Sequence, residues 1–171
     1  MSSAATILVR PARESDQAAL TNLDAAAWSP ESGFPSVIQA AAHPGGTFFT
    51  AADPPGIHLV AELDDTVVGY VRLKPPTHLP ENAHVTYVAG LAVHPSARRR
   101  GVAAALMTAA EPFARARAAR KLSLRVLSTN QPAIRLYERL GFEREGALRD
   151  EFLIGGRYVD DVLMAKRLWA S

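Results

Sequence analysis

A basic turn between an apolar strand and an alanine-rich helix constrains the fold more than any other feature of the sequence. The apolar run 84–93 ends at His94, the arginines Arg98–Arg100 follow, and Gly101 begins a helical pattern. The first amides of a helix lack partners within it and lie at the positive end of its dipole. Because Gly101 and the small Ala103 would let phosphate oxygens approach these amides, the pattern predicts an anion-binding turn. A solvated basic turn that only caps the helix is the alternative.

Hydrophobic periodicity predicts short strands and helices on both sides of this turn. The expected strands are residues 7–9, 58–63, 67–73, 84–93, 122–126, 147–154 and 158–164. The expected helices carry Leu20 and Leu23 after a cap at Ser15 or Asp16, span residues 101–117, and follow the cap Asn130 to end at Gly141. Pro112 should kink or shorten the second of these helices.

Short turns indicate how the elements connect. Asp64-Asp65-Thr66 and Gly155-Gly156 each separate two apolar runs as a tight β-hairpin would. Gly90, inside an apolar strand, indicates a β-bulge or a place where a ligand or another backbone comes close. At 171 residues, the chain is expected to form a single layered α+β domain over residues 1–171.

Residues 29–55 are irregular, because proline and glycine are frequent there. At most a short helix around residues 36–42 fits this segment. The segment and its flanks contain four large aromatic residues, Trp28, Phe34, Phe48 and Phe49. Side chains of this kind are usually at least partly buried. We therefore expect a loop that folds back onto the domain, and that covers a site there, rather than a linker.

Composition excludes several classes of function. There are no cysteines, which excludes a disulfide framework, cysteine-ligated zinc, an iron–sulfur cluster and a thiol nucleophile. The five histidines have no metal-like spacing, so no metal is expected. The net charge of +2 is too small for general affinity to nucleic acid or anionic membrane, and no apolar stretch or leader-like start indicates a membrane span or export. A cytoplasmic protein without nucleic-acid or membrane partners is expected.

Two motifs resemble the GNAT superfamily of acetyl-CoA-dependent N-acetyltransferases. Residues 98–103, Arg-Arg-Arg-Gly-Val-Ala, are similar to that family's Arg/Gln-x-x-Gly-x-Gly/Ala signature after a strand. Residues 130–142, from Asn130 to Phe142, resemble its Asn-x-x-Ala-x-x-Leu-Tyr-x-x-x-Gly-Phe segment. The opening Ile7–Ala12 also resembles the family, and the likeness is weakest over residues 28–56.

The resemblance implies a fold, a cosubstrate and a set of site residues. The implied fold is a twisted, mostly antiparallel sheet flanked by helices, splayed between its central strands so that acetyl-CoA fits between them. The implied cofactor-binding residues are Leu91, Ala92, Val93, Arg98, Arg99, Arg100, Gly101, Val102, Ala103 and Asn130. Strand backbone would bind the pantetheine arm, and amides of 98–103 the pyrophosphate. Tyr137 would lie near the thioester sulfur as a catalytic residue; a core tyrosine is the alternative.

The sequence does not identify the amine that would receive the acetyl group. Residues 148–164 resemble a branch that includes amino-acid, phosphinothricin and ribosomal-protein N-terminal acetyltransferases. A small primary amine such as an amino acid is the first expectation, and a protein N-terminus the second. A non-catalytic sensor that binds acyl-CoA is the alternative of another class. The resemblance also allows a homodimer.

The general base is not assigned by the sequence. A carboxylate on or near the central strand would fit the family, but residues 84–94 contain no Asp or Glu. The candidates are Glu62, Glu81, His84, Asp160 and Asp161. For each carboxylate, a solvated or structurally paired group is the favoured explanation, and for His84 a surface residue at a strand edge is favoured over a base.

Overall fold

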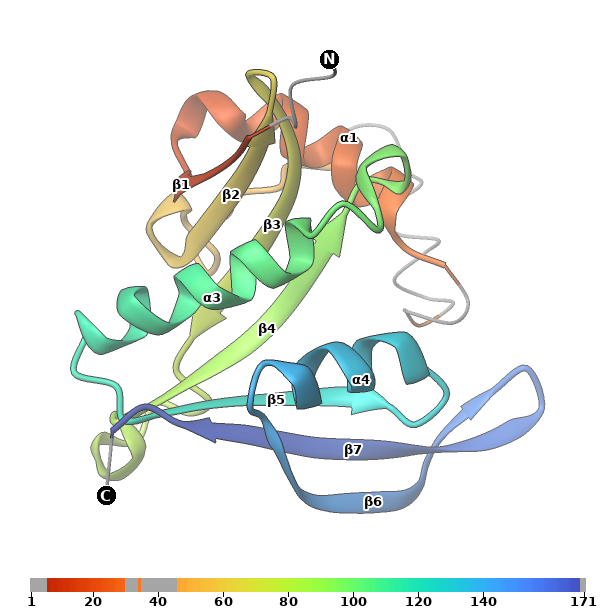
Figure 1. Cartoon of the computed structure of the whole chain (residues 1–171). Helices are drawn as coiled ribbons and strands as arrows, with labels where there is room; N and C mark the ends of the chain where they lie inside the picture. Colours follow the sequence, from red (N-terminus) through yellow and green to blue (C-terminus); the bar gives the residue numbers. More distant parts are fainter. Residues whose placement is uncertain (1–5, 30–33, 35–45, 170–171) are drawn as a thin grey trace.

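Seven strands form one sheet in the order β1-β2-β3-β4-β5-β7-β6 in the computed structural model, which describes residues 6–29, 34 and 46–169 (Figure 1). The strands are β1 (Ile7–Pro11), β2 (His58–Leu63), β3 (Thr66–Lys74), β4 (Val85–Val93), β5 (Lys121–Leu127), β6 (Glu143–Ile154) and β7 (Arg157–Arg167). Within these described residues, the helices of more than one turn are α1 (Gln17–Ala27), α3 (Val102–Arg115) and α4 (Gln131–Arg139). Neighbouring strands are antiparallel except β4 and β5. The predicted α+β class with a mostly antiparallel sheet is confirmed.

Both predicted hairpins are present, and their turns have positive φ at both central residues, as two-residue hairpin loops of this kind require. The φ values are 48° and 60° at Asp64 and Asp65, and 57° and 76° at Gly155 and Gly156. β6 begins at Glu143, four residues before its predicted start. The first half of β6 is exposed on both faces. Its sequence therefore lacks the alternation of apolar and polar residues that would have predicted a strand there.

The two ends of α4 follow the predicted signals, whereas the start of α1 and the end of α3 differ from the prediction. The Asn130 side chain accepts from the amide of Ala133 at 3.3 Å, and Gly141 ends α4 with φ of 86°. Asp16 occupies the position before α1, but its carboxylate accepts from the Arg13 amide and pairs with the Arg10 guanidinium, both at 2.8 Å, instead of capping α1. The α3 helix continues one turn beyond Pro112 and ends at Arg115.

Helices cover both faces of the sheet, so there are two cores. On one face α3 and α4 bury residues such as Leu106 and Ile134 against the strands. On the other face α1 packs with Phe48, Phe49 and Tyr70. The segment after α1 therefore does fold back onto the sheet where the structure describes it, and the short helix expected at 36–42 lies outside the described residues.

A bulge in β4 changes which face its side chains meet. Arg72 pairs with Gly90 and Leu73 with Val88, which leaves Ala89 as the extra residue beside the glycine that predicted a bulge. Val88 packs in the α3 core and Ala92 in the α1 core. In a regular strand, residues four apart share a face, so the bulge is what turns the second half of β4.

Candidate active site

The strands β4 and β5 part in the middle of the sheet and leave a cleft of about 920 Å³. They pair only through Val85–Lys121, Thr86–Leu122 and Tyr87–Ser123. Beyond these pairs, residues 88–93 keep β3 on one side and face the cleft on the other. Backbone groups along a free strand edge can pair with amides of an extended ligand. The splay expected of the central strands is therefore present.

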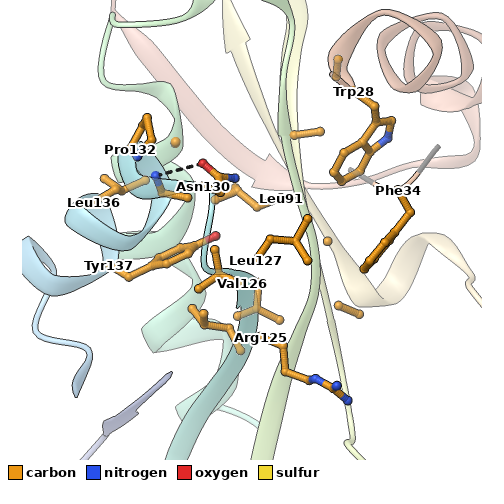
Figure 2. Close-up of a pocket in the computed structure, with 18 of the residues that line it drawn as sticks. Trp28, Phe34, Leu91, Arg125, Val126, Leu127, Asn130, Pro132, Leu136 and Tyr137 are labelled. Atoms are coloured by element: carbon orange, nitrogen blue, oxygen red, sulfur yellow. Dashed lines mark hydrogen bonds between the residues drawn. The ribbon is translucent and has the colours of Figure 1, made fainter. Parts of the chain in front are cut away.

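On the α4 side, the cleft wall is largely apolar and uncharged. Asn130, Pro132, Leu136 and Tyr137 line it from α4 and its cap, opposite Leu91 of β4 (Figure 2). Asn130 and Tyr137 are two helical turns apart, so the helix brings both to the same ligand space. This wall suits an uncharged, extended chain.

The Tyr137 phenol is buried at the base of this wall. The residue is 7% exposed, and its ring lies 5.8 Å from the ring of Phe142. Burial, with a smaller contribution from Tyr87, raises the pKa of Tyr137 to about 12. The phenol therefore stays protonated at physiological pH and can act as a hydrogen-bond donor.

The basic turn lies at the mouth of the cleft. The Arg98 guanidinium donates to the carbonyl of Val93 at 3.3 Å and to the carbonyl of Ala27, the last residue of α1. Positive φ values of 61° at Arg99 and 85° at Gly101 wind the chain into the start of α3. Arg98 thus connects the end of α1 to β4.

The structure brings together most of the predicted site residues. The cleft is lined by Leu91, Ala92, Val93, Arg98, Ala103, Asn130 and Tyr137. Arg99, Arg100 and Gly101 are exposed on the turn outside the lining, and the Val102 side chain is buried in the α3 core. For these four residues, any contact to a ligand would come from the backbone or from the arginine side chains at the mouth.

The α1 side of the cleft differs from the α4 side. Leu124 and Val126 point into the α3 core, so the strand alternation sends Arg125 to the opposite face. Arg125 donates to Asp161 of β7 through both Nε and Nη2, and Nη2 lies 3.5 Å from Glu151 Oε1. Figure 2 shows Trp28 and Phe34 across β4 from Tyr137.

Only one of the five candidate bases lines the cleft. Asp161 does so, 3% exposed and bound by Arg125. Glu62 is held by Arg10, which also binds Asp16, and Asp160 accepts from the amide of Asp150 at 2.9 Å. Glu81 and His84 are exposed and outside the lining.

Sequence reasoning missed Arg125 and Glu151. The alternation of Leu122, Leu124 and Val126 could have placed Arg125 on the opposite face. Glu151 carried no such signal, because a bulge interrupts β6 between Leu148 and Phe152. Asp150 has φ of 51° there.

Within residues 6–29, 34 and 46–169, no three His, Asp or Glu side chains gather closely enough to hold a metal ion. None of the helices in these ranges is long and apolar enough to cross a membrane.

Comparison with known proteins gives consistent matches. The model of the acetyltransferase (GNAT) family matches residues 18–142. The L-amino acid N-acetyltransferase AaaT of Escherichia coli (strain K12) is 38% identical over 117 residues, which cover 67% of this chain and 71% of that protein. The structure of yncA from Salmonella typhimurium, solved with acetyl-CoA, has a TM-score of 0.75 at 19% identity and covers 97% of this chain and 96% of its own. The ribosomal-protein-alanine N-acetyltransferase of Brucella melitensis has a TM-score of 0.70 at 25% identity, over 94% of this chain and 99% of its own.

Proposed function

Because the chain belongs to the acetyltransferase (GNAT) family and is an acetyl-CoA-dependent N-acetyltransferase, we propose that it acetylates a small primary amine such as an amino acid. The proposal rests on one observation, the parting of β4 and β5 into a cleft whose two sides differ in chemistry. The uncharged side suits a thioester arm, and the charged side suits an amine. The 38% identity to an L-amino acid N-acetyltransferase supports the acceptor class.

Acetyl-CoA fits the residues on the α4 side of the cleft. The free edge of β4 at Leu91–Val93 offers backbone groups to the two amides of a pantetheine arm. At the mouth, the amides of residues 101–103 begin α3 and the three arginines add positive charge, which is where a pyrophosphate would bind. The side chain of Asn130 would contact the pantetheine. Acetyl-CoA supplies the activated acetyl group to this site.

The chemistry assigned to the site is direct transfer. The neutral amine nitrogen bonds to the acetyl carbon, the carbon–sulfur bond breaks, and the sulfur leaves as a thiolate. The nitrogen loses its second proton to solvent as the amide forms. A backbone amide of β4, at Val93 or its neighbours, would donate to the carbonyl oxygen as negative charge develops there. Tyr137 would donate a hydrogen bond to the thiolate.

A base is needed because most amines are protonated at pH 7. Forming the neutral amine costs about 1.4 kcal/mol for a peptide α-amine with a pKa near 8, and about 4.6 kcal/mol for a lysine-like amine. The α-ammonium of a free amino acid lies between these two. Glu151 is the cleft carboxylate with solvent access, since its side chain is 39% exposed while Asp161 is buried against Arg125. We assign Glu151 the role of accepting the ammonium proton.

A peptide N-terminus is the second candidate acceptor. A second hollow of about 320 Å³ shares Tyr87, Leu124 and Arg125 with the main cleft. A chain that extends from the acceptor amine could leave the cleft along it. The likeness to a ribosomal-protein-alanine N-acetyltransferase favours the same candidate.

Release of free thiol from acetyl-CoA tests the proposal. The assay compares free amino acids, short peptides, polyamines and aminoglycosides as acceptors. We expect the highest kcat/KM with free amino acids. Higher values with peptides would favour the second candidate, and acetyl-CoA binding without thiol release from any amine would contradict both.

A further inference from the structure

Aromatic side chains dominate the acceptor side of the cleft. Trp28, Phe34 and Phe152 line it, and the rings of Phe34 and Phe152 meet edge to face with centroids 4.7 Å apart. The indole Nε1 of Trp28 already donates to Asp24 Oδ1 at 2.8 Å. These side chains therefore present apolar surface, and a ligand group that packs against them gains by leaving water.

Arg125, Asp161 and Glu151 form one ion-paired cluster on this side, in which two carboxylates face one guanidinium. Arg98, the other cationic residue of the described cleft lining, lies at the mouth and donates to the carbonyls of Val93 and Ala27. Asp161 occupies both Nε and Nη2 of the guanidinium, whereas Glu151 lies at 3.5 Å and is partly exposed. An ammonium group in the cleft is therefore attracted to Glu151. An acceptor whose side chain carries a carboxylate is disfavoured.

The ammonium site and the aromatic wall are next to each other. Glu151 and Phe152 are consecutive, and both line the cleft. In a regular strand they would point to opposite faces. The bulge between Leu148 and Phe152 interrupts that alternation. An amine beside Glu151 thus brings its own substituent to Phe152.

On the basis of the proposed function, we propose that the acceptor is an amino acid with a large apolar side chain, with phenylalanine as its best representative. Its ammonium lies beside Glu151, and its side chain packs against Trp28, Phe34 and Phe152. A lysine-like side chain would have to bring a second ammonium out of water against these rings, with Glu151 already occupied by the first. An aspartate-like side chain would add negative charge to a cluster that already has an excess.

Acceptor selectivity of the full chain tests this proposal. Thiol release is measured with phenylalanine, leucine, alanine, glycine, aspartate and lysine at saturating acetyl-CoA. One buried methylene is worth roughly fourfold in binding, so phenylalanine and leucine should exceed alanine by tenfold or more in kcat/KM.

Phe152→Ala should lower kcat/KM for phenylalanine about tenfold to hundredfold, mainly through KM, and change alanine turnover by less than threefold. Leu153→Ala, the exposed neighbour outside the cleft, is the matched control and should leave both unchanged.

Product binding gives a readout that does not need turnover. N-acetyl-L-phenylalanine should bind at least tenfold tighter than N-acetylglycine by calorimetry, and Phe152→Ala should remove the difference. Equal use of glycine and phenylalanine, or preference for aspartate or lysine, would overturn the inference and leave the amino-acid acetyltransferase intact. Thiol release with peptides only, or with no amine, would overturn the proposed function as well.

Discussion

In the proposed mechanism, Tyr137 donates a hydrogen bond to the thiolate and does not transfer its proton. Its pKa is raised to about 12 by burial, whereas a simple thiol has a pKa near 8.5, so full proton transfer to the thiolate is uphill by about 5 kcal/mol. Tyr137→Phe should therefore lower kcat tenfold to hundredfold, and leave acetyl-CoA affinity nearly unchanged. Tyr158→Phe, on an exposed residue, is the control. A pH–rate limb between pH 7 and 10 that disappears in Tyr137→Phe would show instead that the phenol titrates.

Glu151 has a distinct pH signature if it takes the ammonium proton. General bases contribute roughly 10²–10⁴-fold, so Glu151→Gln should lower kcat/KM at pH 7 by about a hundredfold or more. The defect should shrink toward pH 10, because the amine then loses its proton to solvent. Glu143→Gln, on an exposed residue of the same strand, should have no effect. A defect of equal size at every pH would mean that Glu151 only binds the acceptor.

The segment between α1 and β2 is anchored through a buried neutral histidine. His58 is 0% exposed; its Nδ1 donates to the Pro54 carbonyl at 2.9 Å, and its Nε2 accepts from Arg72 at 3.0 Å. Burial lowers the pKa of His58, and the positive charges of Arg72 and Lys74 lower it further. The hydrogen bond to the Pro54 carbonyl and the charge of Asp53 oppose this shift without reversing it. The unfolded chain therefore takes up this proton at a higher pH than the folded chain does.

Stability should consequently fall as the pH drops below about 6.5, by up to about 1.4 kcal/mol per pH unit. Urea unfolding between pH 5 and 8 measures this slope. His58→Gln, which cannot titrate, should flatten it. Asp16 does not interfere, because Arg10 lowers its pKa and its contribution is lost only below about pH 4. The same slope in His58→Gln would contradict the assignment.

Among the helices and strands, the features that depend on neighbouring residues alone were predicted correctly from the sequence. The hairpin turns at Asp64-Asp65 and Gly155-Gly156, the cap at Asn130 and the glycine after α4 all follow from short-range backbone preferences, and the structure confirms them. The bulge in β6 depends on pairing with β7, so periodicity could not reveal it. For the same reason Glu151 was missed. Tyr137 and Asn130 were proposed from the resemblance of residues 130–142 to the family motif, and their spacing of two helical turns agrees with it. Contacts between segments that are distant in sequence, such as that of Arg98 with Ala27, could likewise not be predicted from the sequence.

At the scale of the whole molecule, the central claim is that acetyl-CoA binds where β4 and β5 part. Hydrogen exchange with and without acetyl-CoA tests this claim most directly, because a bound pantetheine arm and pyrophosphate would shield specific backbone amides. Slower exchange is predicted in residues 88–93 and 98–103, with no change at the Gly155-Gly156 turn. Protection confined to other segments, with residues 88–93 and 98–103 exchanging as in the free protein, would contradict the account.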